Sequence, residues 1–135
     1  MTKEQLRTYR DLRKERDDLA RKIHELEWSM YGPRAQRLDG MPRAGSGGDG
    51  LEGQMDRHNE LRELYRSKVA ELGRQLLAIE RAIERLSSRE RQLIRLHYIE
   101  GLTWEQVCNE MNYSWSQVHR DHREALAKLR EETPT

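Results

Sequence analysis

One stretch near the C-terminus holds the side chains whose types and spacing could do chemistry. His119 and His122 lie three residues apart. That spacing puts both imidazoles on one face of a helix, and imidazole is a common zinc ligand. No third ligand stands nearby to complete such a site, so we expect no bound metal. Gln117 and Arg120 belong to the same stretch. A glutamine amide can pair with adenine and a guanidinium with guanine or a phosphate, which favours nucleic-acid recognition.

The rest of the sequence offers little evidence for a catalytic site or a cofactor site. The carboxylate pair Glu131 and Glu132 lies in a polar tail, where it indicates no acid-base site. The single cysteine, Cys108, can form no internal disulfide and is expected to pack as a small side chain. Residues 45–50 and 48–53 match GxGxxG, but no apolar strand precedes them. We therefore expect no enzyme activity, no cofactor and no small-molecule substrate.

The residues from Leu102 to Leu126 have the pattern of a helix-turn-helix. Two helix starts each combine a capping residue with a glutamine three positions later: Thr103 with Gln106, and Ser114 with Gln117. Asn112 lies between the two helices and tolerates the left-handed conformation of a tight turn. Apolar residues share one face of each helix: Val107 and Met111 on the first, and Val118, Ala125, Leu126 and Leu129 on the second.

The composition is too polar for a large globular core. Hydrophobic residues make up 35% of the chain and charged residues 36%, and phenylalanine is absent. Long amphipathic helices with a wet outer surface fit these values. No apolar run is long enough to span a membrane, and the N-terminus lacks the apolar core of a signal peptide. We expect a cytoplasmic protein without membrane contact.

The charge is nearly balanced, both overall and within the C-terminal region. The net charge is +1, and residues 87–135 carry seven Lys or Arg against eight Asp or Glu. Because neutralisation of phosphates by Lys and Arg supplies most non-specific affinity for DNA, this region should bind DNA weakly by itself.

Two long helices are expected before the helix-turn-helix. From about Thr2 to Tyr31, apolar or long side chains recur at alternating steps of four and three, as in a heptad seam: Gln5, Tyr9, Leu12, Arg16, Leu19, Ile23, Leu26 and Met30. A wider apolar stripe predicts a second helix from about Gln54 to Leu86. Residues 32–53 hold seven of the nine glycines and predict a flexible linker. The helices could pair as an antiparallel hairpin, or between chains as a coiled coil, because the linker is longer than a hairpin needs.

A third helix of the C-terminal domain is predicted to begin after Ser87, which forms a capping box with Glu90. This helix runs through Ile99, and Gly101 serves as its C-terminal stop. The predicted fold is all-α, a long helical hairpin followed by a three-helix helix-turn-helix domain. The predicted domains are residues 1–86, which include the linker, and residues 87–131, with a tail at 132–135.

A family resemblance covers this C-terminal domain. Arg89-Glu90-Arg91 followed by an apolar pair, Gly-Leu-Thr before the motif, and Ala-Leu-Ala-Lys-Leu ending at Leu129 resemble the fourth region of housekeeping-class bacterial sigma factors. That region recognises the upstream promoter hexamer. A helical part followed by a sigma-like helix-turn-helix is similar to small regulators of phages and prophages, including late-gene activators of the RinA and ArpU type.

The resemblance implies DNA contacts early in the second helix of the motif: Trp115, Ser116, Gln117, His119 and Arg120, with Arg123 and Lys128 as candidates for the DNA backbone. Sigma factors commonly have Arg and Glu where Trp115 and Ser116 stand, and an apolar residue in place of Asp121. The promoter sequence that sigma factors read is therefore not carried over. Trp115 could instead pack on the first helix of the motif, and Trp104 is expected to pack in the core or in a half-buried position.

The leading hypothesis is a phage-type transcriptional regulator that binds double-stranded DNA, either as a homodimer or together with RNA polymerase. Two alternatives stay open. One is a small-terminase-like protein of phage DNA packaging, and the other is a coiled-coil adaptor whose helix-turn-helix binds protein.

Overall fold

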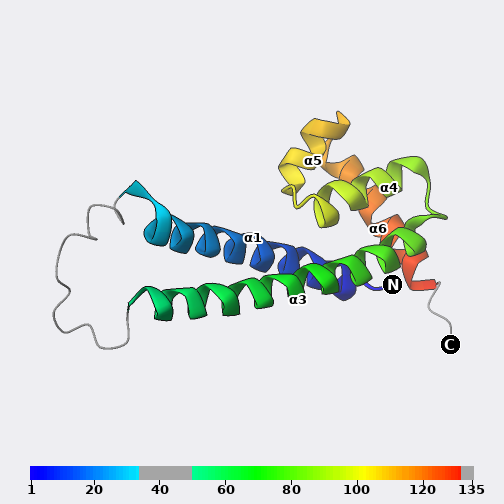
Figure 1. Ribbon diagram of the computed structural model, residues 1–135. Coiled ribbons are helices and arrows are strands. Elements are labelled where there is room, and N and C mark those ends of the chain that lie inside the picture. Colours follow the sequence, from blue (N-terminus) through cyan, green and yellow to red (C-terminus); the bar gives the residue numbers. More distant parts are fainter. Residues whose placement is uncertain (34–49, 132–135) are drawn as a thin grey trace. The chain divides into compact units, whose positions relative to one another are not determined.

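The described part of the chain is entirely helical. A computed structural model describes residues 1–33 and 50–131, and no strand occurs among them (Figure 1). The elements are α1 (Lys3–Tyr31), α3 (Leu51–Ile83), α4 (Ser88–Ile94), the π-helix η1 (Arg95–Ile99), α5 (Trp104–Met111) and α6 (Trp115–Glu131). The all-α fold with long N-terminal helices and a C-terminal helix-turn-helix is thus confirmed.

The chain divides into two compact units, and both contain parts of α1 and α3. The hairpin unit comprises Lys14–Ala70, and the C-terminal unit comprises Met1–Arg13 together with Glu71–Thr135. The division differs from the domain boundary expected at residue 86, because both the start of α1 and the end of α3 belong with the C-terminal helices.

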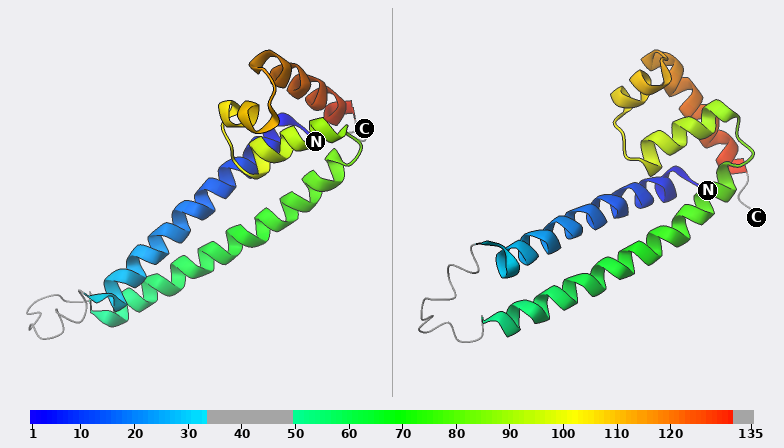
Figure 2. Two further views of the ribbon diagram at one scale, coloured as in Figure 1. Left: turned by 90° about the horizontal axis from the view of Figure 1, so that it is seen from above. Right: turned by 45° about the horizontal axis from the view of Figure 1, so that its top comes forward.

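In the hairpin unit, the two long helices run antiparallel beside each other (Figures 1 and 2). Leu19 and Met30 of α1 are buried, as the predicted seam requires. Polar contacts also join the helices, since Lys68 Nζ lies 3.3 Å from Glu15 Oε2 and His58 Nε2 lies 2.8 Å from Glu27 Oε1. Here the two helices therefore pair within one chain.

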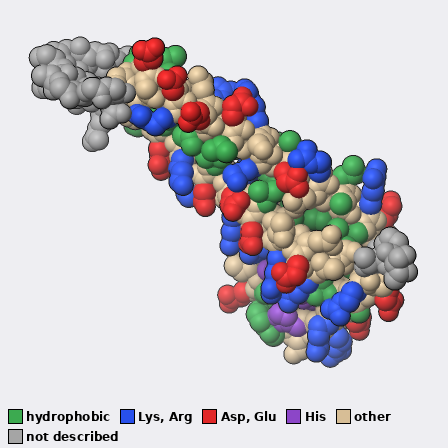
Figure 3. Space-filling model, turned by 90° about the horizontal axis from the view of Figure 1, so that it is seen from below, with side chains coloured by type: hydrophobic (Ala, Val, Ile, Leu, Met, Phe, Trp, Pro, Cys, Tyr) green, Lys and Arg blue, Asp and Glu red, His purple; other side chains and the backbone are tan. Residues whose placement is uncertain are grey.

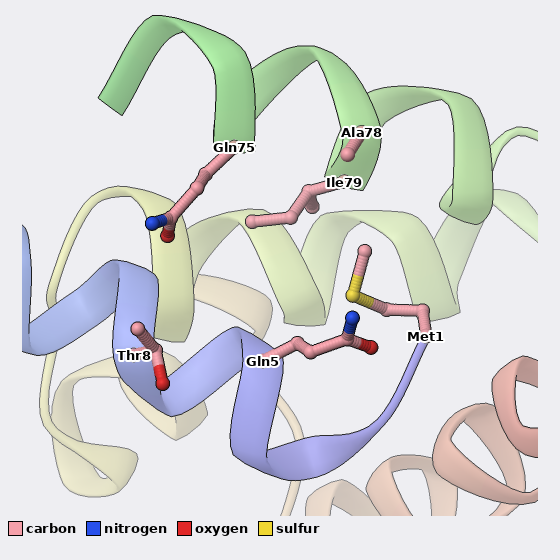
Figure 4. A pocket seen from close by; sticks show the side chains of 6 residues that line it. All are labelled: Met1, Gln5, Thr8, Gln75, Ala78 and Ile79. Carbon is pink, nitrogen blue, oxygen red and sulfur yellow. The ribbon is translucent and has the colours of Figure 1, made fainter. Parts of the chain in front are cut away.

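The predicted seam is wrong at the start of α1. Leu6 is 0% exposed and takes the core position, whereas Gln5 is exposed. Gln5 instead completes a capping box: its Oε1 accepts from the Thr2 N–H at 2.8 Å, and Thr2 Oγ1 accepts from the Gln5 N–H at 3.3 Å. The Gln5 side chain also borders a hollow between α1 and α3, where it faces Met1 and Ile79 (Figure 4).

The second long helix begins earlier than predicted and ends earlier. α3 starts at Leu51 and stops at Ile83, so the prediction that residues 51–53 belong to a non-helical linker is wrong. Leu86 lies beyond the helix yet is buried, which keeps it in the core as the apolar stripe implies. Residues 34–49 of the predicted linker lie outside the described residues, and with them lie most of the first GxGxxG match and the first two residues of the second.

The core of the C-terminal unit draws on both ends of the chain. Its buried cluster includes Leu6 and Tyr9 of α1, Ile79 and Ile83 of α3, and members of every helix from α4 to α6: Leu93, Ile94, Tyr98, Val107, Met111, Val118, Ala125 and Leu129. Since α1 contributes the buried side chains of Leu6 and Tyr9, its first turns are a structural part of the unit that holds the helix-turn-helix.

We predict that Leu6→Ala destabilises the protein by about 2–5 kcal/mol, because it removes fully buried methyl groups and leaves a cavity. The matched control is Leu64→Ala on α3, where the leucine is 54% exposed and the loss should stay near or below about 1 kcal/mol. Urea unfolding followed by circular dichroism measures both. Equal losses for the two variants would contradict the placement of α1 in this core.

Candidate nucleic-acid interface

Helices α5 and α6 are joined by the tight turn that the sequence predicts. Asn112 adopts a left-handed conformation with φ 58°, and the Tyr113 N–H donates to the Cys108 carbonyl at 3.2 Å. Thr103 and Gln106 form the expected reciprocal capping box at the start of α5. Val107 and Met111 are buried, so α5 presents its apolar face to the core as predicted.

The start of α6 is capped by one bond instead of the two that a capping box supplies. Ser114 Oγ accepts from the Gln117 N–H at 3.2 Å, as predicted. The Gln117 side chain does not return to Ser114. It donates from Nε2 to Asp121 Oδ1 at 3.1 Å, one helical turn further on. The predicted capping box at this position is therefore only half formed, because a buried carboxylate holds the amide.

The helix that precedes the helix-turn-helix is α-helical in its first part and π-helical in its second. α4 begins at the predicted capping box of Ser87 and Glu90, both bonds of which are present. From Arg95 the chain continues to Ile99 as a π-helix, and Gly101 then adopts φ +80°. Arg10 of α1 donates to the carbonyls of His97 and Gly101 at 3.2 and 3.4 Å. These two carbonyls near the end of η1 are thus partnered by a residue from the start of the chain.

Two ion pairs with buried carboxylates fix α6 against α4. Asp121 is 2% exposed, and its carboxylate lies 2.9 Å from Arg89 Nε. The Arg89 guanidinium also lies 5.3 Å from the centre of the Tyr113 ring, within cation–π range. About two turns further along α6, Lys128 Nζ lies 2.8 Å from buried Glu90 Oε1. Burial raises the pKa of Glu90, but bonds from Lys128 and Ser87 outweigh it and hold that pKa below its usual value.

A cluster of aromatic rings and histidines lies between α6, η1 and α5. The Tyr98 hydroxyl and His122 Nε2 are 2.8 Å apart, and both residues are buried. His97 stacks on Trp104 at 3.8 Å between ring centres, and its Nδ1–H donates to the Leu102 carbonyl at 2.8 Å. Burial lowers the pKa of His97 and of His122 to about 4, so both imidazoles are neutral at pH 7.

The first half of α6 borders an open hollow on the surface of the C-terminal unit. Five of the seven predicted contact residues line it: Trp115, Ser116, His119, Arg120 and Arg123. His122 and Lys3 of α1 complete the lining. A space-filling view shows histidine side chains bordered by Lys and Arg on one face of the molecule (Figure 3). The hollow therefore joins cationic, aromatic and hydroxyl groups, a set suited to a polyanion with apolar edges.

Trp115 and His119 form the aromatic part of this surface. Trp115 is 57% exposed, and its ring centre lies 4.2 Å from that of His119. His119 also lies 5.2 Å from Trp104, so its imidazole has a tryptophan ring on either side. His119 Nε2 is buried with no hydrogen-bond partner among the described residues. Trp104 is half-buried and packed against the core cluster, close to the core position expected from the sequence.

The other two predicted contact residues, Gln117 and Lys128, do not line the hollow. Gln117 is bound to Asp121, and Lys128 is paired with Glu90. Their DNA contacts stay predictions, and each would have to be made alongside, or in exchange for, the bond within the protein.

Sequence reasoning missed three residues that shape this site: Lys3, Arg89 and Asp121. In the sequence, Asp121 stands out only as a departure from an apolar pattern. An acidic residue in an otherwise core-facing register could have pointed to a buried ion pair, with Arg89 as a possible partner. No local signal in the sequence places Lys3 beside α6, since the contact depends on the fold.

The comparison with protein families decides how this arrangement is classified. Residues 82–131 match the family model Sigma-70, region 4. The C-terminal region is a sigma-70 region 4-like helix-turn-helix domain. The match spans less than half of the chain and covers α4 to α6, which suggests a DNA-binding helix-turn-helix regulator. Searches of curated proteins and of solved structures found no match.

Among the described residues, no helix is long and apolar enough to cross a membrane.

We predict that the stability of the sigma region 4-like domain falls as the pH drops from about 6.5 to 4. The folded-state pKa of His97 and His122 is about 4, whereas an unfolded histidine titrates near 6.5. Between these values the unfolded chain binds the extra protons, so protonation favours unfolding. Each ring should contribute a loss on the order of 3 kcal/mol by pH 4.

Urea unfolding of the wild type and His122→Gln at a series of pH values tests this. His122→Gln should remove about half of the dependence between pH 6.5 and 4, because His97 remains. His24→Gln, which replaces an exposed histidine, should leave the dependence unchanged. A wild-type stability that stays level over this range would contradict the neutral, buried state of the two rings.

Proposed function

We propose that this protein is a cytoplasmic, non-enzymatic transcriptional regulator of phage type that binds a specific double-stranded DNA site through α6. The observation that carries the proposal is the hollow beside the first half of α6. In a helix-turn-helix, the first turns of the second helix enter the major groove. Here those turns carry the exposed Trp115 and the cations Arg120 and Arg123.

Each side chain on this surface has a contact that its chemistry favours. The Trp115 ring offers an apolar surface of the kind that fits a thymine methyl group. Arg120 is exposed and can bind guanine through two parallel hydrogen bonds, or bind a phosphate. Arg123 lies one turn further along and suits the DNA backbone. The Gln117 amide has a second N–H and its carbonyl oxygen left for adenine while the first N–H stays on Asp121.

The balanced charge of the domain favours a regulator that acts with a partner. Residues 87–135 carry seven basic and eight acidic side chains. Two of the basic ones, Lys128 and Arg89, are paired with buried carboxylates. Few cations remain to release counterions from DNA. We propose that a second copy, joined through the long helices, or RNA polymerase supplies the missing affinity, because linking two weak sites raises the effective concentration of each.

We predict that Arg120→Ala weakens binding to the cognate site by roughly tenfold to a hundredfold, the cost of one lost bidentate base contact. Gln117→Ala should weaken it by a similar or smaller factor and relax the preference at one base pair. Fluorescence anisotropy on DNA from the neighbouring genomic region measures both, with and without RNA polymerase. The control is Arg74→Ala, which removes an exposed arginine on α3 that is paired with Glu71. Unchanged affinity for Arg120→Ala would contradict reading by α6.

The solution mass separates the regulator from the alternatives. A dimer, or a monomer that binds DNA only with polymerase, fits the proposal, and light scattering reports either state. A closed ring of roughly eight or more copies would instead favour a packaging role. An adaptor would be favoured if the protein binds a protein ligand and if neither Gln117→Ala nor Arg120→Ala weakens that binding.

A further inference from the structure

We propose that the first turn of α1 is part of the DNA-contact surface and that Lys3 binds a phosphate next to the recognition helix. This inference rests on the proposed function and extends it to a segment more than a hundred residues away in the sequence. The resulting surface has two parts, with α6 in the groove and the start of α1 on the backbone at its edge.

The first support is the position of Lys3. Its side chain lines the same hollow as Ser116, Arg120 and Arg123, so its ammonium group shares one surface with the proposed reading residues. The positive charge of Lys3 also acts on buried His122, where it adds to the effect of burial in lowering the pKa of that imidazole. Lys3 is itself exposed, which leaves the charge accessible to a ligand.

The second support is the way in which the fold holds this lysine in place. Leu6 and Tyr9, one and two turns beyond Lys3, are buried in the cluster that contains Val118 and Leu129 of α6. Arg10 adds hydrogen bonds to the carbonyls of His97 and Gly101. The Met1 amine lies 3.4 Å from the Leu129 carbonyl. The first turns of α1 are therefore fixed against the helix-turn-helix, and Lys3 needs little ordering to meet a ligand there.

The third support is a difference in pairing: several cations of this unit have carboxylate partners, whereas those that line the hollow have none among the described residues. Arg89, Arg95 and Lys128 are paired with carboxylates. Within residues 1–33 and 50–131, no ion pair joins Lys3, Arg120 or Arg123 to a carboxylate. Residues 1–13 also carry four Lys or Arg against two Asp or Glu, whereas residues 87–135 carry one more acidic than basic residue. The start of α1 thus makes the surface beside α6 more positive.

The chemistry of Lys3 favours a phosphate over a base edge. A lysine ammonium is a compact point charge on a flexible stem, without the planar fork with which arginine reads guanine. Lys3 also comes from a second helix and not from the first turns of α6, which are the part of the motif that reaches the groove floor. A contact of this kind fixes orientation and adds affinity without selecting a sequence.

The test is the salt dependence of DNA binding by Lys3→Ala, measured by anisotropy with two fluorescein-labelled duplexes, one of the neighbouring genomic sequence and one of mixed sequence. Loss of one phosphate contact should reduce the slope of log affinity against log salt by about 0.9. Affinity at low salt should fall roughly threefold to tenfold, by the same factor on both duplexes. Lys3→Arg should retain the wild-type slope.

The matched control is Lys14→Ala, which removes an exposed lysine of the same helix from the hairpin unit and should change neither slope nor affinity. Circular dichroism spectra and urea midpoints of the variants establish that each is folded. A Lys3→Ala slope equal to that of the wild type, while Arg120→Ala binds weakly, would overturn this inference and leave the proposed function standing. If the wild type binds neither duplex, with or without RNA polymerase, the proposed function fails, and this inference fails with it.

Discussion

Burial of Leu6 and Tyr9 among the C-terminal helices is the interaction on which the rest of the C-terminal unit depends. α4 has 7 residues and α5 has 8, and helices of such length gain their stability from an apolar face packed on neighbours. α1 supplies part of that face and α3 supplies Ile79 and Ile83. The sigma region 4-like sequence covers residues 82–131, but the core that supports it begins at residue 6. The segment that matches the family is therefore smaller than the unit that packs as one body.

A second constraint acts within this core, where ionisable groups are buried and must be satisfied. A buried carboxylate is costly unless it is paired, and Glu90 and Asp121 each have a cation from another helix. The two pairs lie about two turns apart on α6 and end on neighbouring residues of α4, so they join the two helices at two points. His97 and His122 meet the same constraint differently, because they stay neutral and bond to a carbonyl and a hydroxyl.

Local signals allowed much of this fold to be predicted from the sequence. The capping boxes at Ser87 and Thr103, the left-handed Asn112 and the glycine stop at Gly101 depend on neighbouring residues, and the structure has all of them. The errors arise where distant contacts decide. From the spacing alone, Gln5 and Leu6 fit the heptad pattern equally well. The packing of α1 on the C-terminal helices places Leu6 in the core. The π-helical winding of Arg95–Ile99 likewise has no signature in a pattern that is read at 3.6 residues per turn.

For the candidate site, the sequence analysis predicted seven contact residues on α6, and five of them line one hollow in the structure. The contacts that hold the remaining two within the protein could not be predicted from the sequence. Gln117 illustrates this. Its amide is bound to Asp121, which is itself held by Arg89 of α4 and is nearly inaccessible to solvent. A glutamine that pairs with adenine must present a donor and an acceptor in a fixed plane. A free glutamine side chain would lose rotamer entropy to do so. If α6 reads DNA as proposed, the bond to Asp121 would remove part of that loss before DNA binds. Asp121, which breaks the apolar pattern of the helix, would then act by orienting the amide of Gln117 one turn away.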